Sequence, residues 1–469
     1  ITATRRGCHI GSVSKLAISN PKNLIFGRSP KPVATKSGMV IGGGQVYPEI
    51  NFTLPPMLIT AETMNRVEEH YREMIAGTLK RAAELQAPGV VVEFETLPPM
   101  TENPDWGMRV VQILLDGMEA ERSRSGLKST LRMTPNDTRE MERPPRMRSG
   151  ALYDAMLELF ERSAAAGCEF LSIESVGGKE VHDDALMLCD IKQVIFSLCI
   201  LGSRDMEFLW TKLAGIAKKH GVHAAGDTAC GFSNTSMVLA EQKMIPRVFA
   251  AVDRTVSAVR SLEAYRAGAV GPGKDCGYEN IILKAITGCP MANEGRMASG
   301  AHLSPVGNIA GAACDTWSNE SIQNVKLLGA MAPVVGMEQL AFDCRLFNKT
   351  LEEGADSALQ YQRWLVESDC WLDPQGVILR PDSAIRAAEA IVSAETPFLA
   401  GIAVAEATVS MLQEAKQSGR LVLNDRESAY LEKISDDLSD MTRDEEAFIN
   451  EMMDEVEVEK FRPEDYLIG

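Results

Sequence analysis

The feature that most constrains the fold is a regular alternation of helical and strand patterns between about residues 62 and 250. Residues 62–86 carry apolar side chains at spacings of three and four among many charges, which predicts an exposed amphipathic helix that ends at Pro88-Gly89. The β-branched run 90–94 then predicts a strand. Further helices are predicted over 106–124, 151–165 and 203–220 (capped by Ser203), and further strands over 128–134, 170–173 and 222–225. Repeated units of this length imply parallel strands joined by right-handed crossovers.

Two architectures are compatible with such units, an open doubly wound sheet and a closed barrel. No GxGxxG opens a helix and no GxxxxGK[ST] is present, and the run Gly42-Gly43-Gly44 is a turn beside a strand. Candidate functional residues follow several different strands, which favours a barrel with its chemistry at one face. The sequence therefore predicts an α/β fold, a (β/α)8 TIM-type barrel over residues 61–350. Residues 1–60 are expected to form an N-terminal arm with a hairpin-like segment, and residues 351–469 a helical C-terminal extension.

The predicted extension has two parts of different character. Residues 382–420 are rich in alanine and helical in pattern, whereas 436–465 are strongly acidic with scattered Met, Phe and Val. We expect the extension to pack on the barrel or on a second subunit, in a homodimer. A solvated tail is the alternative for its last thirty residues.

The composition excludes some classes of partner and location. The formal net charge of −17 and a pI of about 5.0 argue against a nucleic-acid partner. Ten cysteines in 469 residues are too few for a disulfide scaffold, which favours the reducing cytoplasm. No apolar run reaches the length of a membrane span. Residues 1–48 contain no acidic side chain and could resemble a transit peptide, but a fragment or an extended start is the preferred interpretation.

Three side chains that could bind a metal each follow a strand-like run. They are Glu174 in LSIESVGG, Cys230 in GDTACGF and Cys276 in GPGKDC. Two thiolates and one carboxylate could hold one zinc ion with its fourth position open, as in a catalytic site. The alternative is that these cysteines pack in the core, since no CxxC or HExxH spacing supports a metal.

These motifs, together with FGRSPKPV, IGGGQVYPEINFTLPP, VLAEQ, AHLSPVGNIAGA and WSNESIQNVKLL, carry a family resemblance. The chain resembles the zinc-containing methanol:corrinoid methyltransferases, the B subunits of methanol-using systems in methanogens and acetogens. The resemblance runs from about Lys15 to the end, more loosely over the last hundred residues. It implies a (β/α)8 barrel and zinc bound by Glu174, Cys230 and Cys276.

The resemblance also implies a reaction, in which the methyl group of methanol moves to Co(I) of a corrinoid. Zinc would act as a Lewis acid, but two thiolates and a carboxylate weaken its acidity, so a proton donor or a nearby cation should assist. Asp227, Lys274 and Asp275 are the candidates, because they flank the ligands. Their alternative roles are hydrogen bonding to the ligands and ordinary loop capping.

The corrinoid is expected to come from a separate protein. A DxHxxG signature marks corrinoid proteins of this class, and none of the six histidines lies in one. Residues 41–56 and the loops that hold Cys230 and Cys276 are the expected contact surface for that protein. Of the histidines, His302 is the better candidate for the active-site face and His223 is expected in the core.

Three alternatives of function stay open at this point. The methyl donor could be a methoxylated aromatic compound or a methylamine. The chain could be a zinc-dependent barrel hydrolase or lyase, although six histidines are few for such sites. It could also be a non-catalytic partner with structural zinc, for which no fourth ligand is obvious.

Overall fold

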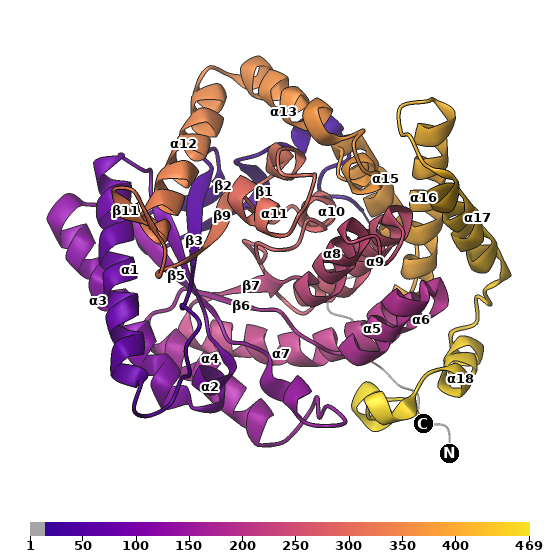
Figure 1. The fold of residues 1–469 in the computed structure, drawn as a ribbon, viewed down its shortest axis with the longest axis horizontal. Helices are drawn as coiled ribbons and strands as arrows, with labels where there is room; N and C mark the ends of the chain where they lie inside the picture. The colour runs from indigo at the N-terminus through magenta and orange to yellow at the C-terminus, as the bar shows by residue number, and fades with distance from the viewer. Residues whose placement is uncertain (1–14) are drawn as a thin grey trace.

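The computed structural model describes residues 15–469, and its centre is one sheet of seven strands (Figure 1). All neighbouring strands in this sheet run parallel, in the spatial order β7-β6-β5-β4-β3-β9-β8. The strands are β3 (Tyr47–Thr53), β4 (Val90–Glu95), β5 (Ser129–Thr134), β6 (Phe170–Ile173), β7 (His223–Asp227), β8 (Ala292–Glu294) and β9 (Thr316–Ile322). The expectations for residues 1–14 fall outside the described residues.

An irregular segment joins the two edges of this sheet. The backbone N–H of Val270 donates to the carbonyl of Ala224 in β7 over 2.8 Å, and Gly273 forms a parallel bridge with Met291, just before β8. Residues 270–273 therefore take the place of a strand between β7 and β8. The ring has eight positions, and the predicted (β/α)8 barrel is confirmed.

Helices form the outer layer of the barrel (Figure 1). Their bounds are α1 (Met64–Glu84), α3 (Pro104–Ser125), α4 (Ala151–Ala166), α7 (Ser203–His220), α9 (Arg247–Arg266), α10 (Asn280–Thr287) and α12 (Ala332–Glu352). Shorter helices in the loops are α2 (Pro98–Glu102), α5 (Lys179–Leu188), α6 (Ile191–Ile195), α8 (Thr235–Glu241) and α11 (Arg296–Ala301). The four helices predicted from periodicity lie within about two residues of their observed bounds.

The predicted cap of one helix is wrong. Ser203 does not cap α7, because α6 continues through a π-helical segment, η3 (Phe196–Gly202), directly into α7. The hydroxyl of Ser203 donates to the carbonyl of Leu198 within this continuous helix. No cap is needed there, because the carbonyls of the preceding helical turns accept from the first N–H groups of α7.

A β-hairpin closes the amino-terminal end of the barrel. Its strands are β1 (Arg28–Ala34) and β2 (Val40–Gly43), which pair antiparallel. Their apolar side chains form a small buried cluster with residues of the barrel strands: Val33, Met39, Ile41, Tyr47, Val91, Phe170 and Ala225. His223 also binds this hairpin, with Nε2 3.1 Å from the carbonyl oxygen of Ala34.

The predicted boundary at residue 60 assigns β3 to the N-terminal arm, which is wrong. This strand belongs to the barrel, where it pairs with both β4 and β9. Glu49 and Asn51 of this strand are buried, and Glu49 binds the equally buried Arg132 over 2.6 Å. These polar side chains in the barrel interrupt the apolar pattern that marks a buried strand. The remaining division of the chain, with the extension after α12, we keep as a proposal.

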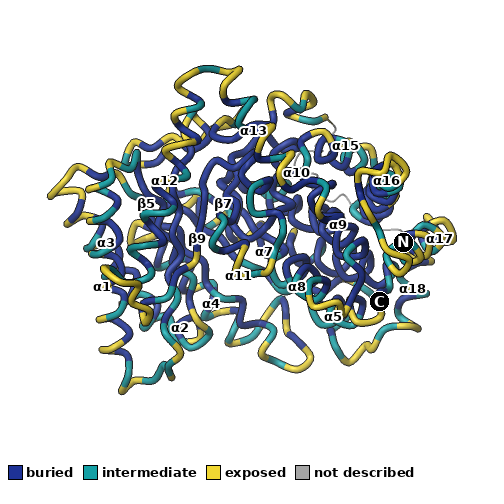
Figure 2. The backbone as a smooth tube through the Cα atoms, turned by 45° about the horizontal axis from the view of Figure 1, so that its top comes forward, coloured by how far each residue is buried: buried dark blue, intermediate teal, exposed yellow. Residues whose placement is uncertain are grey.

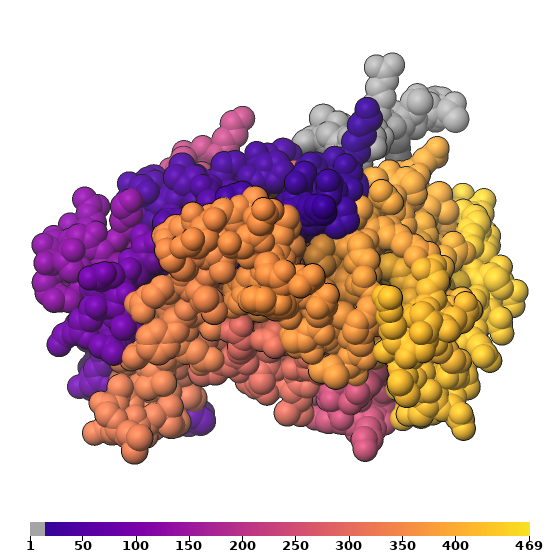
Figure 3. Space-filling view, turned by 90° about the horizontal axis from the view of Figure 1, so that it is seen from above, coloured from indigo at the N-terminus to yellow at the C-terminus, as the bar shows by residue number. Residues whose placement is uncertain are grey.

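The C-terminal extension is helical and packs on the barrel. It contains α13 (Ala355–Asp369), α14 (Pro374–Ile378), α15 (Pro381–Val392), α16 (Pro397–Gln417), α17 (Asp425–Asp440) and α18 (Glu445–Glu455). Seen from above, its orange and yellow segments form one side of the molecule (Figure 3). The helix α9 is consequently buried along almost its whole length (Figure 2).

The last thirty residues are also packed, so the solvated-tail alternative is wrong. Phe448 is fully buried and stacks on Phe398 at 4.7 Å between ring centroids. The hydroxyl of Tyr466 accepts a hydrogen bond of 3.1 Å from the backbone N–H of Gly178, four residues beyond Glu174. The chain end therefore holds a loop of the barrel.

Among the described residues, α16 is long and apolar enough to cross a membrane by length and composition, contrary to the expectation of no such run. Of its most apolar window, 61% is buried inside the protein, where the helix packs against α9 and α15. This burial is typical of a core helix.

Candidate metal centre

The three predicted metal ligands meet at the carboxyl end of the barrel. Glu174 directly follows β6, Cys230 begins a π-helical turn, η4 (Cys230–Asn234), just after β7, and Cys276 follows the segment 270–273. Their ligand atoms all lie within 4.8 Å of one another. Three adjacent positions of the barrel thus each contribute one ligand atom to the same point in space.

Close approach of the two cysteine loops depends on Gly277. A Cβ atom at this position would lie 2.2 Å from Oγ1 of Thr228 and 2.8 Å from Oε1 of Glu279. No side chain fits in that space, so a glycine is required beside Cys276.

The ligand set suits a divalent cation. Cys276 Sγ donates to Glu174 Oε1 over 2.8 Å. The hydrogen bond that Cys276 donates to Cys230, burial and the charge of Asp275 raise the pKa of Cys276 well above its ordinary range. Cys276 lowers the pKa of Cys230 by hydrogen bonding, but burial and Glu174 outweigh this and raise it to about 12. Three acidic groups converge here, and thiolate sulfur and carboxylate oxygen are both ligand types that zinc accepts.

Lys274 is the cation of the site and is fully buried. Its Nζ lies 2.6 Å from Asp275 Oδ1, 3.0 Å from Glu93 Oε1 and 3.3 Å from Glu174 Oε1. Burial lowers the pKa of Lys274, but the charges of Asp275, Cys276 and Glu93 outweigh it and hold the pKa well above its ordinary value. The ammonium group is therefore a fixed positive charge beside the ligands.

The other two candidate proton donors are held in different ways. Burial opposes ionisation of Asp275, but Lys274 and a 2.6 Å hydrogen bond from Ser318 outweigh it, so the pKa of Asp275 lies below its ordinary value. Asp275 is an ionised partner that orients Lys274. Asp227 accepts hydrogen bonds from the backbone N–H groups of Thr228 (2.8 Å) and Ser175 (3.2 Å) and from Trp210 Nε1 (2.9 Å). These contacts match its alternative role of loop capping.

Two carboxylates at the end of β4 were not selected as site residues from the sequence. Glu93 contacts Lys274, and its Oε2 atom is buried without a hydrogen-bond partner among the described residues. Burial and the charge of Glu174 raise the pKa of Glu95 to about 8. Their position at the end of a predicted strand, which is also the position of Glu174, could have identified both as site residues.

A cavity of about 140 Å³ lies beside the ligands. Its walls include Glu174 itself, Glu95 and Val176, together with residues from the loop after β5. His302 lies at the same end of the barrel, with Nδ1 2.9 Å from Oε2 of Glu294 at the end of β8. His223, in contrast, binds the hairpin at the opposite end.

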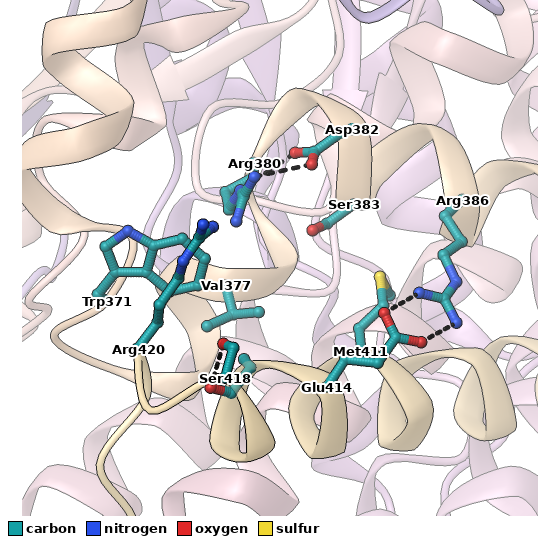
Figure 4. Close-up of a pocket in the computed structure, with 11 residues that line it drawn as sticks. Trp371, Val377, Arg380, Asp382, Ser383, Arg386, Met411, Glu414, Ser418 and Arg420 are labelled. Carbon is teal, nitrogen blue, oxygen red and sulfur yellow. Dashed lines mark hydrogen bonds and ion pairs between the residues drawn. The ribbon is translucent and has the colours of Figure 1, made fainter.

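A second cavity, of about 190 Å³, lies between α15 and α16 in the extension (Figure 4). Arg380 and Arg420 lie over the ring of Trp371, at 4.5 Å and 5.2 Å from its centroid. Arg386 on the other side is paired with Glu414 at 2.7 Å. None of the predicted site residues lines this cavity, so it is separate from the candidate metal centre.

A parallel barrel with thiol and carboxylate groups clustered at its carboxyl end is typical of barrel enzymes, whose active sites lie at that end. Within this class, residues 11–467 match the sequence profile of the methanol-cobalamin methyltransferase B subunit, MtaB. The chain belongs to this family, and the resemblance seen in the sequence is confirmed.

Two relatives agree with this assignment. The chain is 36% identical to a methanol–corrinoid protein co-methyltransferase of Methanosarcina barkeri, over 97% of this chain and 98% of that protein. It is similar to a chain in the crystal structure of the methanol:cobalamin methyltransferase complex MtaBC from the same species. That match has a TM-score of 0.92 and 36% identity, over 97% of this chain and 99% of the other.

Proposed function

We propose that this chain transfers the methyl group of methanol to the cobalt of a corrinoid held by a separate protein, with zinc on Glu174, Cys230 and Cys276. The observation that carries the proposal is the convergence of these three ligand atoms within 4.8 Å at the carboxyl end of the barrel. Membership of the methyltransferase family supports the reaction, and the names of the relatives support methanol and a corrinoid protein.

When bound, zinc would supply Lewis acidity toward the alcohol oxygen, which makes hydroxide a better leaving group. The chain supplies the ligands and the charge around them. Lys274 offsets part of the negative charge of the ligand set, and Asp275 with Glu93 holds its ammonium group in place. A fixed cation in a buried site stabilises negative charge more strongly than it would in water.

The cavity beside Glu174 supports a small methyl donor. Its volume of about 140 Å³ accommodates an alcohol such as methanol. Val176, in its wall, limits it further on one side.

The corrinoid protein would approach the carboxyl end of the barrel, where the ligands lie. Loops at this end expose large apolar side chains, including Leu58 (80% exposed) after β3, Leu303 after β8 and the fully exposed Leu328 after β9. Exposed apolar side chains around a site favour contact with another protein. Residues 41–45 of the expected contact surface belong to the hairpin and the turn after it at the opposite end, so that part of the prediction is wrong.

Two further features belong to this proposal. We place the homodimer contact on the helical extension. We also place the protein in the cytoplasm, because the nine cysteines of the described residues are all free thiols. Family membership supports a role in methanogenesis or acetogenesis.

Purified, zinc-loaded protein mixed with methanol and reduced corrinoid, free or on its carrier protein, tests the proposal. Methylcobalamin should form, as followed by its absorbance, and metal-free protein should give none. Demethylation of an aryl methyl ether without turnover of methanol would contradict the assignment of the donor.

A further inference from the structure

Asn234 lies between the two cysteine ligands, at the end of the turn η4 that Cys230 begins. Its Nδ2 atom donates to the carbonyl of Cys276 over 2.9 Å and to Sγ of Cys230 over 3.6 Å. One amide group therefore ties the sulfur of one ligand to the backbone of the other. The side chain is almost completely buried, so water does not compete for these contacts.

The orientation of this amide is set by Arg254 on α9. The Nη2 atom of Arg254 donates to Oδ1 of Asn234 over 2.9 Å. A guanidinium group only donates hydrogen bonds, so the atom that faces it must be the amide oxygen. The amide nitrogen then necessarily points toward the cysteine loops.

Arg254 also contacts both loops directly and is fully buried. It donates to the carbonyl of Ser233 over 3.2 Å, and its Nη1 atom lies 3.6 Å from Oε2 of Glu279, three residues after Cys276. Glu279 in turn accepts a hydrogen bond of 2.8 Å from the backbone N–H of Ala229, next to Cys230. One guanidinium group thus links the chain around both ligands.

The anchor of Arg254 comes from the C-terminal extension. Its Nε donates over 2.8 Å to Oε1 of Gln375 in α14, which is buried as well. A continuous series of hydrogen bonds therefore runs from the extension to a metal ligand, through Gln375, Arg254, Asn234 and Cys230.

We propose that Asn234 and Arg254 are positioning residues of the metal centre, and that the extension fixes them through Gln375. Asn234 holds the two sulfur ligands at a set separation, and its N–H withdraws charge from the Cys230 thiolate. Less charge on a thiolate leaves a bound zinc ion more acidic, which the reaction of the proposed function requires. This inference rests on the proposed zinc site.

Asn234→Leu tests the first step, because leucine has a similar size but can neither donate nor accept. Zinc affinity, measured by competition with a chelator, should fall about 10- to 100-fold. The thiolate-to-metal absorption band of the cobalt(II)-substituted protein should shift. Arg254→Lys keeps the charge but not the forked geometry and should act in the same direction.

Gln375→Leu should lower zinc affinity less than Asn234→Leu does. Gln375→Glu keeps the acceptor for Arg254 and should therefore keep the zinc affinity of the wild type. Gln362→Leu is the matched control, because Gln362 is a buried glutamine of the same extension. Within residues 15–469, its side chain donates only to the carbonyls of Leu24 and Ala312. It should lower thermal stability to a similar extent without changing zinc affinity. Circular dichroism of the metal-free proteins excludes variants that do not fold.

Wild-type zinc affinity and an unchanged cobalt band in Asn234→Leu and Arg254→Lys would overturn the inference. So would an equal loss of affinity in Gln362→Leu, which would indicate general loosening. If wild-type protein binds zinc and transfers methyl groups while the variants match it, only this inference fails. If wild-type protein takes up no zinc, the proposed function fails with it.

Discussion

The ammonium nitrogen of Lys274 lies 3.3 Å from Oε1 of Glu174, so a buried cation contacts a candidate metal ligand directly. The same nitrogen also contacts Glu93, Glu95 and Asp275. A single positive charge is therefore shared among four carboxylates at the end of the barrel.

Lys274→Met should lower methyl transfer from methanol by at least about 100-fold, because it removes the fixed cation from the site. It should also destabilise the fold by about 3 kcal/mol, since removal of one partner leaves buried carboxylates unpaired. Single-turnover formation of methylcobalamin and denaturant unfolding measure the two effects. Methyl transfer at the wild-type rate in a folded Lys274→Met protein would show that the cation has no part in the reaction.

Cys230→Ala and Cys276→Ala should each lose most of the bound zinc and nearly all activity, because two remaining protein ligands make a weak site. Metal analysis after dialysis measures the zinc. Cys199→Ala is the control, because Cys199 is buried against Gly401 and is not one of the three clustered ligands. It should lower stability by about 1 kcal/mol through lost packing. Full zinc occupancy in either ligand variant would show that the assignment is wrong.

Removal of the metal by a chelator should abolish methyl transfer, and addition of zinc should restore it. Circular dichroism should change little, because the barrel core does not depend on the three ligands for its packing. Activity that persists after complete removal of zinc would refute a catalytic role of the metal.

Glu263→Gln should change how stability depends on pH. Burial raises the pKa of Glu263 from 4.5 to about 7, despite the opposing effect of Arg266. The folded state therefore holds its proton more tightly than the unfolded state. This group lowers stability as pH rises from about 4.5 to about 7, by up to about 3 kcal/mol.

The variant lacks this titration, so its stability relative to wild type should improve between pH 5 and pH 8, as measured by urea unfolding at both values. Glu395→Gln, at an exposed position, is the control for the substitution itself. A pH-independent difference for Glu263→Gln would contradict the raised pKa.

Tyr466→Phe should destabilise the protein by about 1 kcal/mol, because it removes the acceptor of the buried Gly178 N–H. Thermal unfolding measures the effect. Tyr430→Phe, in α17, is the comparison, and should change stability by less than half as much because Tyr430 is only partly buried. An unchanged unfolding temperature for Tyr466→Phe would show that the chain end does not hold this loop.

The sequence by itself determined the barrel class and the three candidate ligands. Helices such as α1 have a period that depends only on local spacing, so the apolar pattern of residues 62–86 is sufficient to find them. Glu174 and Cys230 stand out because they directly follow recognisable strands, and the carboxyl ends of parallel strands meet at one face.

Only the tertiary structure decided which segments complete the barrel and the site. The polar interior of β3 and the irregular segment 270–273 have no local strand pattern, because long-range pairing rather than apolar alternation holds them in place. The charges around Lys274 and the bonds from Gln375 through Arg254 to Asn234 join residues far apart in the chain. Such contacts produce no recognisable residue pattern in the sequence, because the burial of these side chains and the choice of their partners arise only when the chain folds.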